Sequence, residues 1–299
     1  MNVIQKVRTP AEIYDEMFVP ALFAHWGPIM CDIGQVGPGE LVLDVACGTG
    51  ALARAAFERV GPQGTVTGLD PNPDMLSVAR RRSPGIAWRD GKAEAIPFPD
   101  ASFDAVLSQF GFMFFDNRVQ ALSEMMRVLR PGRSLAVAVC DAVERSPGYA
   151  AFAHLLQRLF GKSVADAFRA PFILGDSKRL RAICDEAGIA GAEILQRNEK
   201  VGFASIDALV STERACVWTL GGVLNDDQFA RLLKESEQAL RPFVGANGAI
   251  TFDMLALIIS AKKPERRSPP ACASSTPRCR ANRRSRGTAR RPARGRAAP

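Results

Sequence analysis

The sequence predicts an α/β protein with a Rossmann-like, doubly wound, mostly parallel sheet of seven strands and with helical lid insertions. Short apolar runs rich in Val, Leu and Ile alternate with helical patterns from residue 41 onward, which is typical of βαβ units. A glycine-containing turn at residues 44–50 joins the first apolar run to the first helix, where doubly wound proteins hold their ligands. With 299 residues, of which 47% are apolar, the chain is long enough to bury such a core.

Seven strands are expected, because seven short runs are apolar and are bounded by turn residues. They cover residues 41–45, 65–69, 86–88, 103–108, 135–139, 193–203 and 250–261. Helices are expected between them at residues 51–60, 72–82, 117–129 and 176–187. The run Arg130-Pro131-Gly132 and Gly188 mark the ends of the last two helices, because proline and glycine stop helices.

The chain is predicted to have three parts. Residues 1–35 form an N-terminal helical lid, in which residues 11–30 are expected to be one helix. Residues 36–263 form the main domain, with helical insertions near residues 145–175 and 206–244 where the strand pattern is interrupted. Residues 264–299 form a tail rich in Arg, Pro and Ala, which we expect to be disordered and dispensable for folding and catalysis.

The net charge of +8 is unevenly distributed along the chain. Residues 261–299 hold thirteen Lys and Arg against one acid, whereas the rest of the chain holds 26 basic and 30 acidic residues. The predicted fold is therefore slightly acidic, and nucleic-acid binding is expected only through the tail. The absence of aliphatic residues larger than Ala after Pro264 is the reason that we expect no packed structure there.

Several classes of protein are disfavoured by the composition. The sequence contains no run of 18 apolar residues that could span a membrane. Charged residues near the N-terminus, such as Lys6 and Glu12, do not fit a signal peptide. The seven cysteines are scattered without CxxC or Cys/His spacing, which favours neither a disulfide framework nor a metal site. We therefore expect a cytoplasmic protein without a bound metal; the sequence leaves its oligomeric state open.

The turn after the first strand indicates a nucleoside-binding site. Gly48 and Gly50 permit a positive φ and a close approach of the backbone to a ligand. Asp70 lies twenty residues after Gly50, at the end of the second strand, where a carboxylate can accept both hydroxyls of a ribose. This arrangement suits S-adenosylmethionine (SAM), NAD and FAD alike.

Two further segments distinguish among these ligands. The run from Gly91 to Asp104, which includes Pro97, and the run from Glu124 to Gly132 resemble the class I SAM-dependent methyltransferases, when taken together with Asp44. More closely, they are similar to the small-molecule branch that includes the ubiquinone/menaquinone-biosynthesis methyltransferases. The resemblance covers roughly residues 14–263 and implies that SAM is the cofactor and a small molecule the acceptor.

The resemblance also implies roles for single residues. The methionine part of SAM would be held by Asp44, Ala46, Gly48 and Gly50. Asp70 would bind the ribose, and Pro71 and Met75 would pack on the adenine. The adenine edge would be recognised by the Ala93 backbone and Glu94, and Ser108 would lie close to the methyl group at the end of the fourth strand. The sequence departs from the usual pattern at Lys92, where an Asp often stands, because Lys has no hydrogen-bond acceptor.

The acceptor pocket is expected to be apolar and to be built from aromatic residues outside the alternating sheet pattern. Its predicted members are Tyr14, Phe18, Trp26, Phe110, Tyr149 and Trp218. A sulfonium methyl group is already activated, so catalysis needs mainly in-line alignment with the acceptor and exclusion of water. No general base stands out; His154, His25 and Tyr14 are its candidates, and the histidines fit an ordinary surface or core position equally well.

Three other functions remain open at this point. The turn satisfies the G-x-G-x-x-A pattern of an NAD-dependent oxidoreductase, with Asp70 at a suitable distance. The arginine-rich tail suits a nucleic-acid methyltransferase, although residues 108–111 read Ser-Gln-Phe-Gly and not the Asn/Asp-Pro-Pro-aromatic pattern of the amino-methylating type. The lack of an evident base suits a protein that binds SAM without catalysis.

Overall fold

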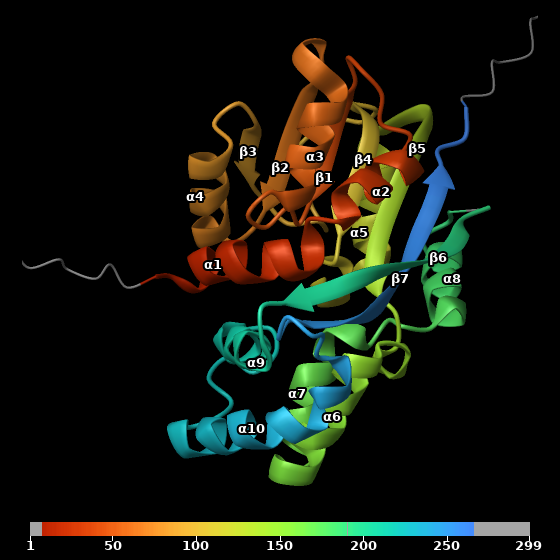
Figure 1. The fold of residues 1–299 in the computed structure, drawn as a ribbon. Helices are drawn as coiled ribbons and strands as arrows, with labels where there is room; N and C mark the ends of the chain where they lie inside the picture. Colours follow the sequence, from red (N-terminus) through yellow and green to blue (C-terminus); the bar gives the residue numbers. More distant parts are fainter. Residues whose placement is uncertain (1–7, 190, 266–299) are drawn as a thin grey trace, which may run out of the picture. The chain divides into compact units, whose positions relative to one another are not determined.

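A computed structural model describes residues 8–189 and 191–265, and the expected tail beyond residue 265 lies outside them. Its sheet has seven strands in the order β3-β2-β1-β4-β5-β7-β6 (Figure 1). The first five strands pair in parallel, and β7 runs antiparallel to both β5 and β6. The predicted doubly wound, mostly parallel sheet is thus confirmed. The strands are β1 Leu41–Val45, β2 Thr65–Asp70, β3 Ala87–Asp90, β4 Phe103–Gln109, β5 Leu129–Cys140, β6 Glu193–Phe203 and β7 Ile250–Lys262.

The central strands are buried on both faces, which is why their sequences are almost continuously apolar. Helices α2 and α3 pack on each other in front of the sheet, whereas α5 lies behind it and contacts α8 (Figure 1). Asn72 and Asn117 cap α4 and α5, because each side chain accepts a backbone N–H of the first turn. The helices that flank the sheet are α2 Trp26–Ile33, α3 Ala51–Val60, α4 Pro73–Arg82, α5 Arg118–Val128 and α8 Ser177–Glu186.

A second group of helices, α6, α7, α9 and α10, gathers beyond the carboxyl end of β5 (Figure 1). The long strands β6 and β7 reach towards this group, and α9 also contacts the N-terminal segment. These helices are α6 Pro147–Phe160, α7 Lys162–Arg169, α9 Ile206–Ala215 and α10 Asp226–Ala239. Short 3₁₀ turns are η2 Gly61–Gln63, η3 Phe112–Phe114, η4 Val143–Arg145, η5 Ala170–Phe172 and η6 Arg241–Phe243.

The N-terminal segment differs from the single helix predicted over residues 11–30. It begins with α1 Pro10–Ile13, continues as the π-helix η1 Tyr14–Phe23, and turns at Ala24 before α2. Pro20 lies inside η1, where its missing N–H interrupts the regular α-helical pattern. The wider π-helical turn carries three aromatic residues, Tyr14, Phe18 and Phe23, that the next section places at the cavity.

Strand β5 begins earlier than predicted. Leu129 pairs with Phe103, and the register between β4 and β5 shifts before Ala105 pairs with Ser134. The Arg130-Pro131-Gly132 run therefore forms an irregular start of the strand, which a local reading interprets as the end of a helix.

Candidate active site

A cavity of about 380 Å³ opens at the carboxyl ends of β1, β2, β4 and β5. The strand order reverses between β1 and β4, and such a switch point is where doubly wound sheets bind their ligands. The lining residues are Tyr14, Phe18, Leu22, Phe23, Ala46, Gly48, Asp70, Pro71, Asn72, Met75, Gln109, Phe110, Gly111, Met113, Phe114, Phe115, Cys140, Tyr149, Phe168, Pro171, Phe172, Glu213, Cys216, Trp218, Thr219 and Met254. The cavity thus joins the glycine turn to a largely aromatic wall.

The two glycines of the turn have different tasks. Gly48 has a φ of +55° and lines the cavity, and a Cβ there would lie 3.9 Å from its nearest neighbour, an atom of Tyr14. Gly50 has a φ of +87° and is not among the lining residues; a Cβ there would lie 2.4 Å from the Trp88 ring. Gly48 therefore leaves room at the cavity, whereas Gly50 lets the turn pack against β3.

Asp44, near the end of β1, is 1% exposed, and neither of its carboxylate oxygens accepts a hydrogen bond from a described residue. It lines a small cavity of about 20 Å³, and Tyr14, Phe23 and Ala46 line both this cavity and the larger one. Burial raises the pKa of Asp44 well above its usual range, and the charge of Asp70 adds to this effect. A buried carboxylate without a partner fits a ligand that brings a positive charge, as the ammonium group of SAM does.

Asp70 ends β2 at the rim of the larger cavity and is 7% exposed. Its two oxygens accept hydrogen bonds from the backbone N–H groups of Gly48 at 2.8 Å and Asn72 at 2.9 Å. Burial raises the pKa of Asp70, although these hydrogen bonds oppose the shift. Each oxygen retains a lone pair that a ribose hydroxyl can use, and Pro71 and Met75 line the cavity next to it.

The loop that carries Ala93 and Glu94 contributes neither of these residues to the cavity lining. Glu94 accepts a hydrogen bond from the Asn117 backbone, and Lys92 pairs with Asp116 at 3.4 Å. The structure therefore does not bring Ala93 or Glu94 into contact with the cavity.

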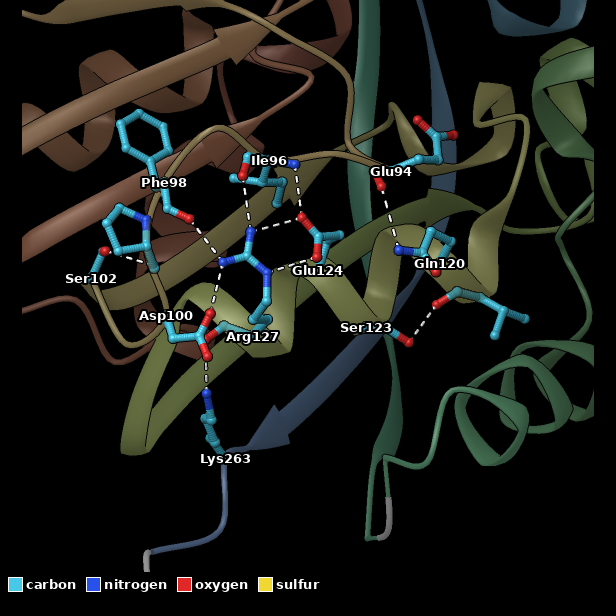
Figure 2. Close-up of polar contacts among 12 residues, drawn as sticks. Glu94, Ile96, Phe98, Asp100, Ser102, Gln120, Ser123, Glu124, Arg127 and Lys263 are labelled. Atoms are coloured by element: carbon cyan, nitrogen blue, oxygen red, sulfur yellow. Dashed lines mark hydrogen bonds and ion pairs between the residues drawn. The ribbon is translucent and has the colours of Figure 1, made fainter.

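Arg127 of α5 fastens this loop to the domain (Figure 2). Its guanidinium group donates to the carbonyl oxygens of Ile96 at 2.9 Å and Phe98 at 2.8 Å, and it pairs with Asp100 and Glu124. Glu124 in turn accepts the Ile96 N–H at 2.9 Å. Arg127 holds the pKa of Glu124 below its usual range through their hydrogen bonds. This network joins the segments around residues 97 and 127.

The end of β4 has a strained backbone. Phe110 has a φ of +55°, which is uncommon for a residue with a large side chain, and it lines the cavity. Ser108 is buried and does not line the cavity, and its Oγ has no hydrogen-bond partner within the described part of the chain. Trp26 is 1% exposed and packs on Phe110 at 5.4 Å between ring centroids, behind the wall of the cavity.

Aromatic rings from separate segments form the rest of the wall. Tyr14 lies 5.5 Å from Phe23 and 5.7 Å from Trp218 between ring centroids, and Tyr149 lies 4.9 Å from Phe252. Tyr14, Phe18, Phe110, Tyr149 and Trp218, five of the six residues expected to line an acceptor pocket, are thereby brought to one cavity.

The histidines expected as possible bases lie elsewhere. His25 and His154 are both exposed, and neither lines the cavity. Tyr14 does line it, but burial and the nearby Cys216 raise the pKa of Tyr14 far above its usual range, which keeps the hydroxyl protonated. The two histidines are therefore not placed to act as a base in the cavity, and the protonated Tyr14 does not serve as one.

Glu213 is a cavity residue that the sequence interpretation missed. It is 2% exposed and lies near Tyr149, Cys216 and Thr219, which line the same cavity. A signal was present, because Glu213 follows Ile206, Leu209 and Val210 at helical spacing on the buried face of α9. A carboxylate on an apolar helix face calls for an explanation.

Comparison with known proteins agrees with this geometry. Residues 42–132 match the family described as Methyltransferase domain. The chain is 34% identical over 187 residues to the ubiquinone/menaquinone biosynthesis C-methyltransferase UbiE of Bordetella avium, which covers 60% of this chain and 72% of that protein. It is 32% identical over 187 residues to the demethylmenaquinone methyltransferase of Listeria welshimeri, covering 60% of this chain and 79% of that protein.

Solved structures share the fold. The YcgJ protein of Bacillus subtilis matches with a TM-score of 0.54 at 20% identity, over 81% of this chain and 99% of that one. A putative methyltransferase of Bacillus halodurans matches with a TM-score of 0.53 at 23% identity, over 80% of this chain and 98% of that one.

The doubly wound sheet, the glycine turn and the acidic residues that end β1 and β2 define a class I SAM-binding protein. The chain belongs to the SAM-dependent methyltransferases of the ubiquinone/menaquinone-biosynthesis type. It is therefore an enzyme that uses SAM as its methyl donor, and the oxidoreductase, nucleic-acid and non-catalytic alternatives are not favoured. Within residues 8–189 and 191–265, no helix has the length and apolar character needed to span a membrane.

Proposed function

We propose that this methyltransferase transfers the methyl group of SAM to a small, apolar acceptor with an aromatic ring, by in-line displacement inside the cavity. The observation that carries the proposal is the cavity itself, which joins Gly48 and Asp70 to the aromatic wall around Phe110, Tyr149 and Trp218. A ligand at the glycine turn and a flat apolar molecule against the rings would thus share one enclosed space.

The chain's own residues supply the contacts that SAM needs. Asp44 would accept the ammonium group of the methionine part, which gives its buried carboxylate the partner that it lacks among the described residues. Asp70 would accept the ribose hydroxyls, and Gly48 leaves space beside them. Pro71 and Met75 would pack on the adenine. Bound in this way, SAM supplies an electrophilic methyl group.

The acceptor would be held by apolar contacts and shielded from water. Phe18, Phe110 and Phe168 contribute apolar surface to the cavity, and Tyr14 and Trp218 pack edge to face beside them. The enclosure orients the acceptor atom and excludes water, which together provide most of the rate for an activated methyl donor. The two relatives, a ubiquinone/menaquinone biosynthesis C-methyltransferase and a demethylmenaquinone methyltransferase, favour a carbon atom of a quinone-type ring as the acceptor.

The division of the chain follows from the same proposal. Residues 36–263 would be the methyltransferase domain, while residues 1–35 and the helical insertions near residues 145–175 and 206–244 would close over the acceptor. The contacts of η1 with α9 and β6 support this arrangement, since they join the N-terminal segment to an insertion. We further propose a cytoplasmic location, as expected from the sequence.

The decisive experiment is incubation of the purified protein with methyl-labelled SAM and a panel of small acceptors. The panel contains a demethylated naphthohydroquinone, a simple phenol and an aliphatic alcohol, with S-adenosylhomocysteine binding measured in parallel. We expect label in an aromatic product. Binding of S-adenosylhomocysteine together with transfer only to the aliphatic compound would contradict the proposed acceptor class.

A further inference from the structure

Glu213 and Tyr149 place two polar groups in a part of the cavity wall that also holds Cys216 and Thr219. Glu213 comes from α9, and Tyr149 comes from α6. Both residues line the cavity and are buried, at 2% exposure each. Around them lie Phe168, Phe172 and Met254, which also line the cavity. Two separate helices therefore direct a carboxyl group and a hydroxyl group to the same wall.

Each group keeps an unused hydrogen-bonding position within the described part of the chain. The Oε2 atom of Glu213 and the hydroxyl oxygen of Tyr149 are buried without a well-formed hydrogen bond, although Tyr149 and Thr219 lie near enough to Glu213 to lower its pKa. Burial of a carboxylate without a cation or donor costs several kcal/mol. If these two groups served only the fold, all their hydrogen-bonding positions would be expected to be filled by protein partners, because almost all buried polar groups are hydrogen-bonded.

A hydroxyl group in the cavity would satisfy both residues at once. It would donate its hydrogen to Glu213 and accept the Tyr149 hydroxyl, so the donors and acceptors match. An apolar ligand without a hydroxyl would leave both groups unsatisfied and would bind less tightly.

We propose that Glu213 and Tyr149 form an acid–base site that receives a ring hydroxyl of the acceptor and takes its proton, so that the enzyme selects aromatic compounds with an ionisable hydroxyl. This inference rests on the proposed function, since it assigns the polar end of the acceptor to the same cavity. Glu213 is the catalytic residue of the pair, and Tyr149 positions the hydroxyl oxygen.

Methylation at a ring carbon begins with the loss of the proton from the acceptor hydroxyl. The O–H bond of the acceptor breaks, its proton moves to Oε2 of Glu213, and the oxygen electron pair is delocalised to the ortho carbon. That carbon forms a bond to the methyl group as the S–CH₃ bond breaks and its electron pair remains on sulfur. The ring carbon then releases its proton to water, and Glu213 returns the first proton to the oxygen.

The electrostatics of the wall support this role. Burial raises the pKa of Glu213 to about 7, partly opposed by Thr219 and Tyr149, so the carboxyl group exchanges its proton near neutral pH. The other titratable groups that face it are thiols and a phenol. Burial raises the pKa of Cys216 to about 11 and moves the pKa values of Cys140 and Tyr149 upward as well, so these remain protonated. Glu213 is thus the group on this wall that titrates near neutrality.

The test compares two probes that differ only in the hydroxyl, 1-naphthol and 1-methoxynaphthalene, bound to the full-length protein in the presence of S-adenosylhomocysteine. Calorimetry gives their dissociation constants for the wild type, Glu213→Gln, Tyr149→Phe and Glu237→Gln. The last variant removes an exposed carboxylate of α10 and serves as the matched control.

We expect Glu213→Gln to weaken 1-naphthol binding by about tenfold, the scale of a charge-assisted hydrogen bond, and to leave 1-methoxynaphthalene binding unchanged. Tyr149→Phe should weaken 1-naphthol binding less, and Glu237→Gln not at all. In the wild type, the preference for 1-naphthol should be greater at about pH 8 than at about pH 5.5, because ionised Glu213 is the stronger acceptor. Glu213→Gln should lose this pH dependence.

Other outcomes would overturn the inference. If both probes bind the wild type and Glu213→Gln does not change the preference, the acid–base site is excluded while the aromatic pocket remains. If S-adenosylhomocysteine binds but neither naphthalene does, the proposed acceptor class fails and this inference fails with it. Tyr149→Phe keeps the test decisive if Glu213→Gln does not fold, since it removes one hydroxyl that makes no well-formed hydrogen bond in the described part of the chain.

Discussion

Asp70 accepts a 2.8 Å hydrogen bond from the backbone N–H of Gly48, so the carboxylate that ends β2 also fixes the glycine turn that follows β1. Asp70, which is proposed to bind the ribose, thereby positions Gly48, which is proposed to leave room for the ligand. Substitution of Asp70 consequently removes a ligand contact and loosens the turn together.

We predict that Asp70→Ala weakens S-adenosylhomocysteine binding by about 1.5 to 3 kcal/mol, the scale of a hydrogen bond to a charged group. Asp70→Asn should lose less, because its amide oxygen still accepts one of the two backbone N–H groups. Calorimetric titration measures both affinities, with Asp185→Asn, an exposed carboxylate of α8, as the control. Unchanged affinity in Asp70→Ala would remove Asp70 from the site.

The two glycines of the turn should respond differently to substitution. Gly48→Val is expected to abolish S-adenosylhomocysteine binding while the protein remains folded, because its side chain would project into the cavity. Gly50→Ala is expected to lower the melting temperature by several degrees, because its Cβ would meet the Trp88 ring at 2.4 Å and φ is positive. Thermal unfolding and calorimetry on both variants separate these effects. A folded Gly50→Ala with wild-type stability would contradict the packing argument.

Sequence patterns predicted the sheet well, because strand periodicity and turn glycines are local properties. Residues 193–203 were predicted as a strand and form β6 with the same bounds. The helix predicted before Arg130-Pro131-Gly132 does end there, at Val128, but the start of the next strand at residue 135 was wrong, because Leu129 already pairs with Phe103 across the sheet. Local propensity does not contain such long-range contacts.

The site was harder to predict from the sequence, because long-range contacts decide which residues line the cavity. Trp26 and Phe110 are both aromatic and buried, and only the tertiary structure shows that Phe110 lines the cavity while Trp26 lies behind it. His25 and His154 were candidate bases because histidine is rare in this sequence, but only the tertiary structure shows that both side chains are exposed. The sequence shows Glu213 as a carboxylate on an apolar helix face. It does not show that Tyr149, 64 residues earlier in the chain, lies next to it.

Arg127 should control the loop at residues 91–100, which the sequence analysis assigned to the adenine edge. We predict that Arg127→Met releases the Ile96 and Phe98 carbonyl groups and increases hydrogen exchange in this loop. S-adenosylhomocysteine affinity should fall with it, whereas Arg158→Met, on α6, should change neither property. Unchanged exchange in the loop would show that Arg127 does not hold it.

The Glu124–Arg127 pair also predicts a pH dependence. Hydrogen bonds from Arg127 lower the pKa of Glu124, so the pair stabilises the fold above the usual glutamate pKa and loses this effect as pH falls through the lower, folded-state value. Glu124→Gln should therefore lower the melting temperature at neutral pH, and the difference from wild type should shrink in acid. A difference that is constant with pH would point to packing and not to charge.

For Glu213 we predict the opposite dependence of stability on pH. Burial raises its pKa to about 7 from the usual 4.5, so the folded state favours the protonated form. The stability associated with that proton is fully present below pH 4.5 and is lost as pH rises through about 7. Because glutamine cannot ionise, Glu213→Gln should be more stable than wild type above neutral pH by about 2 to 4 kcal/mol, and close to wild type in acid.

Melting temperatures measured across this pH range, without acceptor, test the prediction. Glu237→Gln provides the background effect of removing one exposed negative charge. A gain in stability at high pH, combined with a loss of 1-naphthol binding, would mean that Glu213 is kept at a cost to the fold because the acceptor needs it. A Glu213→Gln variant that melts below wild type at every pH would instead show that the carboxylate supports the lid, because removal of a structural partner destabilises the protein whatever its charge.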